Sequence, residues 1–342
     1  MKLVNANNKT LYSISMKKIN WGIIGCGDVT ELKSGPAFNK VNNSALVAVM
    51  RRDVAKASDY AARHQVPTYY SNANLLINDP NVNAIYIATP PSTHREFTLA
   101  ALAANKPVYV EKPMALNYLE AQEMADTADN KNIKLVVAHY RRAQPFFLKI
   151  KQLLSEKIIG ETRFVRLDCF KAALSPDSLK DNKNAWRVDP AVAGGGLFND
   201  LAPHQLDLMR FFFGEAKHVY GTALNQAQLY KADDMVSATI QFESGVVFTG
   251  LWNFNIEAGQ EKDLCEIVGS NGKISFSVFD GHAISVTVNN NTTQYNFTPL
   301  QHVQQPMIEN VVAYFLGEKD NPCTGNDGAI IMKWINHITA KK

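Results

Sequence analysis

The stretch WGIIGCGDVTELKSGPAF, residues 21–38, decides the fold. Its apolar run reads as a buried strand that ends at Gly25 and Gly27 and leads into a helix. Gly25 would permit a tight turn, and Gly27 would let the backbone approach a pyrophosphate group at the start of that helix. Thr30 stands where a third glycine is usual, so the turn alone does not say which dinucleotide binds. A plain strand-to-helix turn is the alternative interpretation.

The pattern around this stretch repeats as far as residue 140. Short apolar runs read as strands, namely INWGIIG, ALVAVM, AIYIAT, PVYVEK and KLVVAHY. Between them, apolar residues recur at helical spacing in DVAKASDYAARH, HREFTLAALAANK and YLEAQEMADTADNKN. Continuous apolar strands that alternate with helices predict βαβ units and a parallel sheet covered on both faces.

The pattern changes after Arg142. A helix that ends before Gly160 and a strand over 161–172 precede a polar loop, the triple glycine 194–196 and a helix over 197–213. Residues 217–297 read as successive strands without helices between them, which is typical of an antiparallel sheet in an α+β domain. Two helices, over 305–316 and 327–340, end the chain.

The predicted fold class is therefore α/β. It has an N-terminal Rossmann domain with a doubly wound parallel sheet, and a C-terminal α+β domain with a large, mostly antiparallel open sheet. We expect the first domain over 16–142 and the second over 143–342, with the last helices packing back on the first. Residues 1–15 lack the apolar core of a signal peptide, and Met16 resembles a natural start, so we interpret them as a flexible extension or a misassigned start. An ordered edge strand is the alternative interpretation.

Bulk composition narrows the class of protein. The net charge of +3 over 342 residues gives no reason to expect nucleic acid or an anionic membrane surface as a partner. No apolar run approaches the ~20 residues of a membrane-spanning helix. The four cysteines are scattered without a CxxC pair, which argues against a disulfide framework or a zinc site and favours a reducing compartment, the cytoplasm.

The end of the second strand bears on cofactor choice. An NAD site usually has an acidic residue there for the ribose 2′-hydroxyl. Here Met50 is followed by Arg51 and Arg52, and arginine suits a 2′-phosphate through its planar, multi-donor head. We therefore favour NADP(H). Asp53 follows directly, so NAD(H) stays open, and a solvated basic pair is the alternative reading of the arginines.

Further cofactor contacts are expected at the start of the first helix and in the turn ATPPSTH. Asp28 would lie at the positive N-terminus of the first helix. The prolines in ATPPSTH would fix the chain as it leaves the sheet near the ribose, with His94 favoured as a helix-start residue over a catalyst. The expected cofactor-binding set is Gly25, Cys26, Gly27, Asp28, Val29, Arg51, Arg52, Thr89, Pro90, Pro91, His94, Glu111 and Lys112.

The strand VYVEKP ends in charge on the ligand edge of the sheet. Ligands of doubly wound sheets bind outside the carboxyl ends of the strands. Lys112 could therefore donate to a substrate oxygen and stabilise a developing alkoxide. We expect burial to lower the pKa of this lysine.

The predicted helix over 197–213 holds a second candidate group. Asp200 and His204 are four residues apart and share one side of the helix. A carboxylate beside an imidazole would orient it and raise its pKa, which suits a general acid and base near neutral pH. Asp207 lies three residues further. Alternatives are a surface ion pair and a metal site with Asp200, His204 and Asp207 as ligands; we predict no metal, because hydride transfer needs none.

The ordered set GIIGCGDV, ATPPSTH and EKP resembles the glucose–fructose oxidoreductase, inositol dehydrogenase and rhizopine-catabolism (Gfo/Idh/MocA) family, over nearly the whole chain from Lys17. The resemblance implies a nicotinamide-dependent oxidoreductase that acts on a sugar, polyol or cyclitol. In that reading His204 shuttles the hydroxyl proton, while Lys112 and Asp200 hold the substrate oxygen and the histidine.

The same resemblance extends to binding residues and assembly. The loop WRVDP would bring Trp186 and Arg187 near the substrate, and Tyr140 and Arg141 of AHYRR would line the cleft where the domains meet. A homodimer or homotetramer through the C-terminal sheet is implied as well. Two other activities stay open: a glycosidase that uses bound NAD without net turnover, and a non-catalytic dinucleotide sensor. The intact set Lys112, Asp200 and His204 argues against the sensor.

Overall fold

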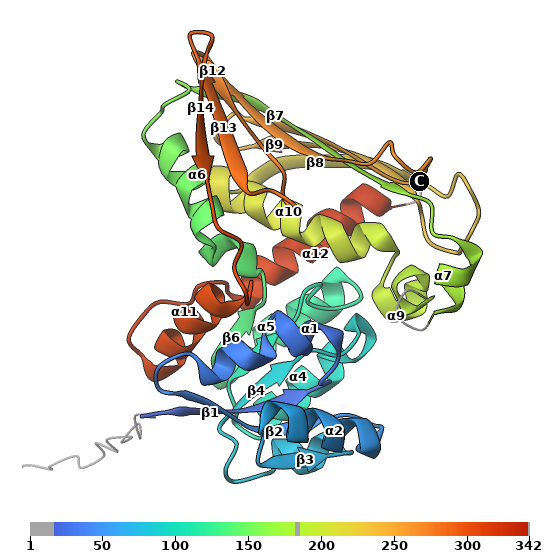
Figure 1. The fold of residues 1–342 in the computed structure, drawn as a ribbon, viewed down its shortest axis with the longest axis vertical. Coiled ribbons are helices and arrows are strands. Elements are labelled where there is room, and N and C mark those ends of the chain that lie inside the picture. Colours follow the sequence, from blue (N-terminus) through green and yellow to red (C-terminus); the bar gives the residue numbers. More distant parts are fainter. Residues whose placement is uncertain (1–16, 182–184, 341–342) are drawn as a thin grey trace, which may run out of the picture.

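The computed structural model describes residues 17–181 and 185–340. The predicted extension over 1–15 lies outside these described residues. Figure 1 shows two sheets at opposite ends of the molecule, with helices between them. The first sheet contains the glycine-rich turn, and the second comes from the later part of the chain.

The first sheet has six parallel strands in the order β3-β2-β1-β4-β5-β6. These are β1 (Ile19–Ile24), β2 (Ser44–Met50), β3 (Thr68–Tyr70), β4 (Ala84–Ile87), β5 (Val108–Val110) and β6 (Leu135–Val137). Helices that connect them are α1 (Asp28–Leu32), η1 (Gly35–Asn39), α2 (Val54–His64), α3 (Ala73–Ile77), η2 (Pro91–Thr93), α4 (His94–Ala103) and α5 (Tyr118–Lys131). The strand order confirms the predicted doubly wound sheet.

Apolar side chains fill three consecutive strands of this sheet, from β4 to β6 at its end. Every residue of β4, β5 and β6 is buried, because helices cover both faces. The strand β3 was not predicted from the sequence. It has three residues, none of them buried, and pairs only with β2 at the sheet edge, so its apolar signal is weak.

The second sheet has eight strands in the order β14-β13-β12-β11-β7-β10-β9-β8. All neighbours are antiparallel except β10 and β7, which confirms a large, mostly antiparallel sheet. The strands are β7 (Thr162–Ala172), β8 (Ala216–Leu224), β9 (Met235–Phe242), β10 (Val247–Ile256), β11 (Lys262–Gly269), β12 (Gly272–Phe276), β13 (Ala283–Val288) and β14 (Asn291–Asn296).

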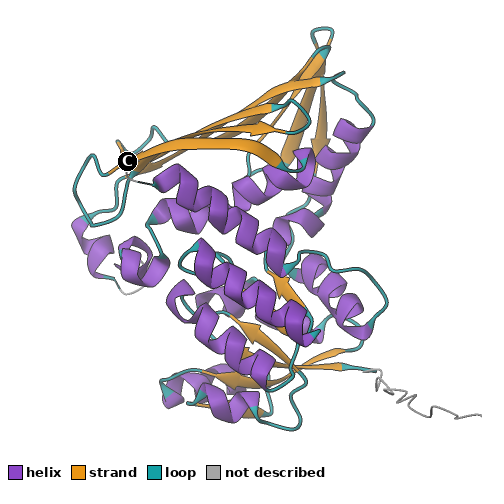
Figure 2. Ribbon diagram, turned by 180° about the vertical axis from the view of Figure 1, so that it is seen from behind, coloured by secondary structure: helices purple, strands orange, loops and turns teal. Residues whose placement is uncertain are grey.

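One face of this sheet is covered and the other is open. Burial alternates along β9 and β10, as expected when one face packs on a core. Figures 1 and 2 show the helices on a single side of the sheet. On that side Trp252 donates to Gln205 of α10 (Leu197–Phe213) at 2.6 Å. The helices of this part are η3 (Tyr140–Ala143), α6 (Pro145–Ser155), α7 (Pro176–Lys180), η4 (Trp186–Val188), α9 (Pro190–Ala193) and α10 (Leu197–Phe213).

The last helices, α11 (Gln305–Leu316) and α12 (Gly325–Thr339), return to the first sheet. The chain before α12 bonds to β6, where the Val137 amide donates to the Cys323 carbonyl at 3.0 Å. Thr324 and Asp327 then form a capping box. This box starts α12 two residues before the predicted residue 327. Among the described residues, no helix has both the length and the apolarity to cross a membrane.

Candidate active site

The glycine-rich turn lies between β1 and α1 and leaves space above its backbone. Gly25 has a φ of +94°, and a Cβ there would lie 2.7 Å from Cγ2 of Thr89. A Cβ on Gly27 would meet no atom closer than 3.9 Å. Gly25 is therefore needed for the turn and its contact with Thr89, whereas the space over Gly27 is open to a ligand. Cys26 is fully buried and offers only its backbone.

The basic pair lies beside this turn. Arg51 donates from Nη1 to the Cys26 carbonyl at 3.2 Å, so its guanidinium lies against the glycine-rich turn. Arg52 is exposed, as is Asp28 at the start of α1, and Val29 is half-buried. Asp53 caps α2, where its carboxylate accepts from the Lys56 amide at 3.2 Å. The turn and Arg51 thus form one edge suited to a dinucleotide.

The prolines of ATPPSTH place a second turn next to the first. Thr89 and Pro90 are half-buried, and Pro91 begins η2. His94 begins α4 and is fully buried, with Nε2 2.7 Å from the Thr89 carbonyl and Nδ1 2.9 Å from the Pro113 carbonyl. Burial lowers the pKa of His94 to about 4. His94 thus joins the turn at Thr89 to the turn at Pro113 from inside the protein, and its fully buried ring is not exposed at the predicted cofactor edge.

Lys112 follows β5 and reaches across to the second part of the chain. Its Nζ lies 2.7 Å from Oδ1 of Asp200 and 2.9 Å from the backbone oxygen of the same residue. Glu111 is buried and accepts from Tyr86 and Gln304 at 2.6 Å each. The bond between Lys112 and Pro113 is cis. The charges that end β5 are therefore held by specific partners on the ligand edge.

The predicted low pKa of Lys112 is wrong. Burial by itself would lower it, but the carboxylates of Asp200 and Glu111 outweigh burial and raise the pKa. The pKa of Asp200 is lowered in turn: burial would raise it, and Lys112 and Arg187 overcome that effect. Lys112 is therefore a charged hydrogen-bond donor at neutral pH, not a proton acceptor.

The predicted pairing of Asp200 with His204 is also corrected. Both lie on α10, but the carboxylate of Asp200 binds Lys112 and also lies 3.4 Å from Nε of Arg187. The pKa of His204 is lowered well below its usual value, first by burial and then by the positive charges of Lys112 and Arg141. Burial and these cations thus favour the neutral form of the His204 imidazole. Its Nδ1 is buried and has no partner among the described residues.

Aromatic residues surround this imidazole. Tyr140 lies edge-on to His204, with ring centroids 5.0 Å apart, and Phe279 lies 6.0 Å away. Trp186 is half-buried, and the guanidinium of its neighbour Arg187 lies over its ring at 4.7 Å. Tyr140 therefore joins His204 directly, whereas Trp186 joins the site through Arg187 and Asp200.

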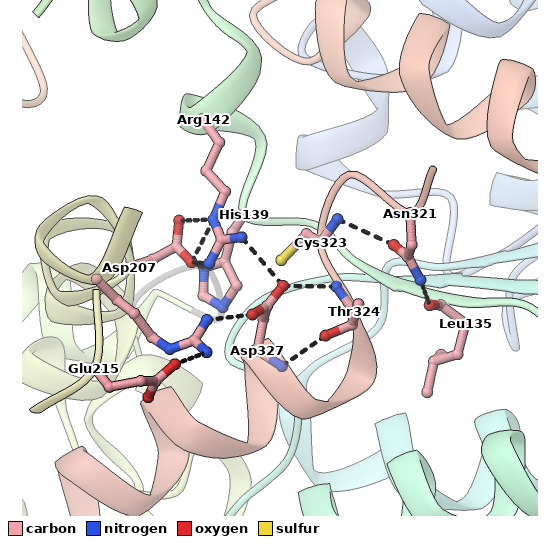
Figure 3. Close-up of polar contacts among 10 residues, drawn as sticks. Leu135, His139, Arg142, Asp207, Glu215, Asn321, Cys323, Thr324 and Asp327 are labelled. Atoms are coloured by element: carbon pink, nitrogen blue, oxygen red, sulfur yellow. Dashed lines mark hydrogen bonds and ion pairs between the residues drawn. The ribbon is translucent and has the colours of Figure 1, made fainter. Parts of the chain in front are cut away.

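Asp207 does not join this group. It is buried and binds Arg142, with Nη2 2.6 Å from Oδ1. Figure 3 shows Arg142 between Asp207 and Asp327, and His139 beside them. Within the part of the chain that the structure describes, no group of three or more His, Cys, Asp or Glu residues could hold a metal ion.

Sequence reasoning missed three residues around the site: His139, Phe279 and Gln304. His139 stood in the quoted stretch AHYRR, next to Tyr140 and Arg141, which the sequence did indicate. Phe279 and Gln304 carried no local signal, because each reaches the site from a loop far along the chain.

A glycine-rich turn, a lysine at the end of β5 and a neutral imidazole from the second part define a dinucleotide-dependent oxidoreductase. Two family models match the chain: the oxidoreductase family with an NAD-binding Rossmann fold over residues 19–139, and the GFO/IDH/MocA C-terminal domain over 147–275. The chain belongs to the Gfo/Idh/MocA oxidoreductase family, which confirms the resemblance seen in its motifs.

Individual proteins that resemble this chain are also oxidoreductases or dehydrogenases by name. Oxidoreductase P35 of Formosa agariphila is 45% identical, and the match covers 92% of this chain and 96% of P35. A trans-1,2-dihydrobenzene-1,2-diol dehydrogenase of Sus scrofa is 31% identical over 67% of this chain and 66% of its own. The structure of a levoglucosan dehydrogenase with NADH and levoglucosan has the same fold, with a TM-score of 0.83, 21% identity and coverage of 94% and 96% of the two chains.

Proposed function

We propose that this protein transfers hydride between NADP(H), with NAD(H) as the second choice, and a ring-shaped sugar, polyol or cyclitol. The observation that carries the proposal is Lys112, held by Asp200 at 2.7 Å beside the neutral imidazole of His204. The cyclic diol in the name of the dihydrodiol dehydrogenase relative supports a ring substrate with hydroxyl groups.

The dinucleotide fits the residues present. The open space over Gly27 would admit the pyrophosphate of the cofactor, and Arg51, which lies against the same turn, would bind the 2′-phosphate of NADP. Thr89, Pro90 and Pro91 would border the ribose. When bound, the nicotinamide supplies a carbon that accepts or releases hydride. The further members of this proposed set are Asp28, Val29, Arg52 and Glu111, with His94 acting only through the turns that it joins.

The side chains would divide the remaining work. Lys112 donates a hydrogen bond to the reacting oxygen and stabilises negative charge on it, an effect that for one such donor is typically about 3–4 kcal/mol. His204 takes the hydroxyl proton in oxidation and returns it in reduction. Asp200 orients Lys112 and compensates its positive charge with an ion pair. Tyr140 packs on His204 and fixes its ring, while Trp186 and Arg187 border the substrate.

We also propose that two or four copies associate through the open face of the large sheet. That face carries a groove of about 490 Å³, bordered by Arg166, Tyr220 and Leu251 among others. Tyr220 is 63% exposed and Leu224 48% exposed. A second sheet would cover these side chains. The four buried, unpaired cysteines support a reducing compartment, the cytoplasm.

A thermal-shift comparison of NAD⁺, NADH, NADP⁺ and NADPH tests the dinucleotide. A ligand at 100 times its Kd stabilises by about 2.7 kcal/mol if it binds only the folded state. We expect the NADP pair to give the larger shift. No shift with any of the four, together with no cofactor absorbance in the purified protein, would contradict the proposal.

A turnover screen tests the chemistry. Sugars, polyols and cyclitols are offered with the preferred cofactor, and reduced nicotinamide is followed by absorbance. We expect His204→Asn to lose at least about 100-fold in kcat, as general bases typically contribute 10²–10⁴-fold. Cofactor binding without turnover on any member of the screen would favour the sensor, and hydrolysis without net change in cofactor would favour the glycosidase.

A further inference from the structure

Two consecutive arginines after β6 have opposite surroundings. Arg142 is buried and forms ion pairs with Asp207 and Asp327. Within residues 17–181 and 185–340, no carboxylate lies within 4.0 Å of Arg141. Its Nη1 donates to the Val278 carbonyl at 2.6 Å, and its Nε is buried without a partner. Arg141 thus keeps a positive charge that the described protein does not neutralise.

Aromatic rings hold this charge in place. The guanidinium carbon of Arg141 lies 4.8 Å from the ring centroid of Phe279, 5.6 Å from that of Tyr140 and 5.7 Å from that of Phe147. Cation–π contacts of this kind fix the orientation of a guanidinium and recover part of the cost of removing it from water. They do not replace a counter-charge, and a charge that is removed from water is costly unless it is paired.

The same rings place Arg141 beside the proposed proton acceptor. Tyr140 and Phe279 contact both Arg141 and His204. The charges that act most strongly on His204 include Lys112, Arg141 and Lys33, all positive, and they help to lower its pKa. Lys112 already shares Asp200 with Arg187. The surroundings of His204 are therefore richer in positive than in negative charge.

The cofactor's phosphates do not account for this charge. The glycine-rich turn follows β1, and Arg141 follows β6, three strands away in the order β1-β4-β5-β6. With neighbouring strands ~4.8 Å apart, the two strand ends are about 14 Å apart. The guanidinium of Arg141 is therefore left for a different anion.

We propose that the substrate carries an anionic group, a carboxylate or a phosphate or sulfate ester, which pairs with Arg141 while its hydroxyl carbon lies at His204 and Lys112. This inference rests on the proposed function and narrows its substrate class to acidic sugars or polyols. A planar guanidinium can donate two parallel hydrogen bonds to such a group, which sets the orientation of the substrate as well as its affinity.

Calorimetric titration of the protein saturated with its preferred cofactor tests the proposal. The probes are D-glucuronate, D-glucose 6-phosphate and D-glucose 6-sulfate, each compared with neutral D-glucose, so that the three anions are separated. We expect at least one acidic sugar to bind at least about tenfold more tightly than glucose, a difference equal to about 1.4 kcal/mol. Equal or weaker binding of all three acidic sugars would overturn the proposal.

Variants locate the effect. Arg141→Gln should remove the preference for the acidic sugar, Arg141→Lys should keep part of it, and Arg163→Gln, an exposed arginine on β7, should keep all of it. An unchanged preference in Arg141→Gln overturns the assignment. Cofactor affinity, measured in each variant by nicotinamide fluorescence, should not change. If the wild-type protein binds no nicotinamide cofactor, the proposed function and this inference are both rejected. If it binds the cofactor but does not prefer an acidic sugar, only this inference is rejected.

Discussion

Lys112 and Asp200 join the two parts of the chain at the site: Nζ of Lys112 lies 2.7 Å from Oδ1 of Asp200 and 2.9 Å from its backbone oxygen. The lysine follows a strand of the parallel sheet, and the aspartate lies in the first turn of α10. The ion pair raises the pKa of Lys112 against the effect of burial. One contact thus fixes both the position and the charge of the proposed oxygen-binding group.

Replacement of Lys112 should therefore lower the rate of catalysis. We expect Lys112→Ala to lower kcat by about 10²–10³-fold, because a preorganised donor to the developing alkoxide is lost. Lys149→Ala, which changes a half-buried lysine on α6, is the matched control. Steady-state kinetics with the preferred cofactor give the answer. A kcat within a factor of two of the wild type would show that Lys112 has no such role.

Buried His94 should make the folded state sensitive to mild acid. Its pKa in the folded state is about 4, against 6.5 for an ordinary histidine. As the pH falls below 6.5, His94 takes up a proton in the unfolded chain but stays neutral in the folded chain, so the folded state loses stability. At ~1.4 kcal/mol per pKa unit, we expect a loss of about 2 kcal/mol between pH 7 and pH 5 from this residue.

Urea unfolding of the wild type and His94→Gln at pH 7 and pH 5 measures this contribution. The variant should be less stable at pH 7, because buried carbonyl partners of the ring are disturbed, but it should lose less stability on acidification. Equal losses for the two proteins would show that another group carries the pH dependence.

The buried pair Arg142 and Asp207 should stabilise the junction of the two parts. Figure 3 shows this pair next to Asp327, which also binds Arg210. Arg142→Met leaves a buried carboxylate without its partner, and such a loss typically costs about 3–5 kcal/mol. We expect a loss of that size in the free energy of unfolding.

A double-mutant cycle separates the pair from its surroundings. Arg142→Met combined with Asp207→Leu should be more stable than the sum of the single changes implies, because no unpaired charge is left at Asp207. Strict additivity would mean that the pair does not interact in the folded state. Thermal unfolding of the four proteins provides the comparison.

The positions of the motifs could be predicted from the sequence, but the residues that their side chains contact mostly could not. Gly25, Gly27 and Lys112 stand at strand ends, which local periodicity locates. The partner of Asp200 is Lys112, 88 residues away, and Asp207 pairs with Arg142 across 65 residues. Helical spacing brought Asp200 and His204 to one side of α10, but it could not show that a lysine from the other sheet takes the carboxylate and leaves the imidazole neutral.

Other features could not be predicted because they depend on contacts between residues that are far apart in the sequence. Gln304 donates to Glu111 across 193 residues, so nothing near either residue indicates the contact. The strand β3 has three residues and no buried side chain, and its pairing with β2 outweighs a weak local signal. The covered and open faces of the large sheet were readable only as alternation, because the sequence does not say which helices lie on which face.

Arg51 should decide between the two dinucleotides. Its guanidinium lies against the glycine-rich turn through the Cys26 carbonyl. We expect Arg51→Ser to weaken NADPH at least about tenfold and to leave NADH within a factor of two, because only NADPH has the 2′-phosphate. Arg163→Ser on β7 is the control. Fluorescence titration with both cofactors measures the effect, and equal weakening of both would assign Arg51 to the turn itself.

The open face of the large sheet should hold copies of the chain together. Exposed apolar side chains on an uncovered sheet face favour association, and a stable interface typically buries ~1,600 Å² in total. We expect light scattering to give at least twice the chain mass of 38.0 kDa. Tyr220→Glu with Leu224→Glu places two charges on that face and should shift the mass to 38.0 kDa. Leu119→Glu, which alters a 76% exposed leucine on α5, should leave the assembly intact. A wild-type protein of 38.0 kDa at all concentrations would mean that the face is covered by nothing in solution, and the proposed assembly would be wrong.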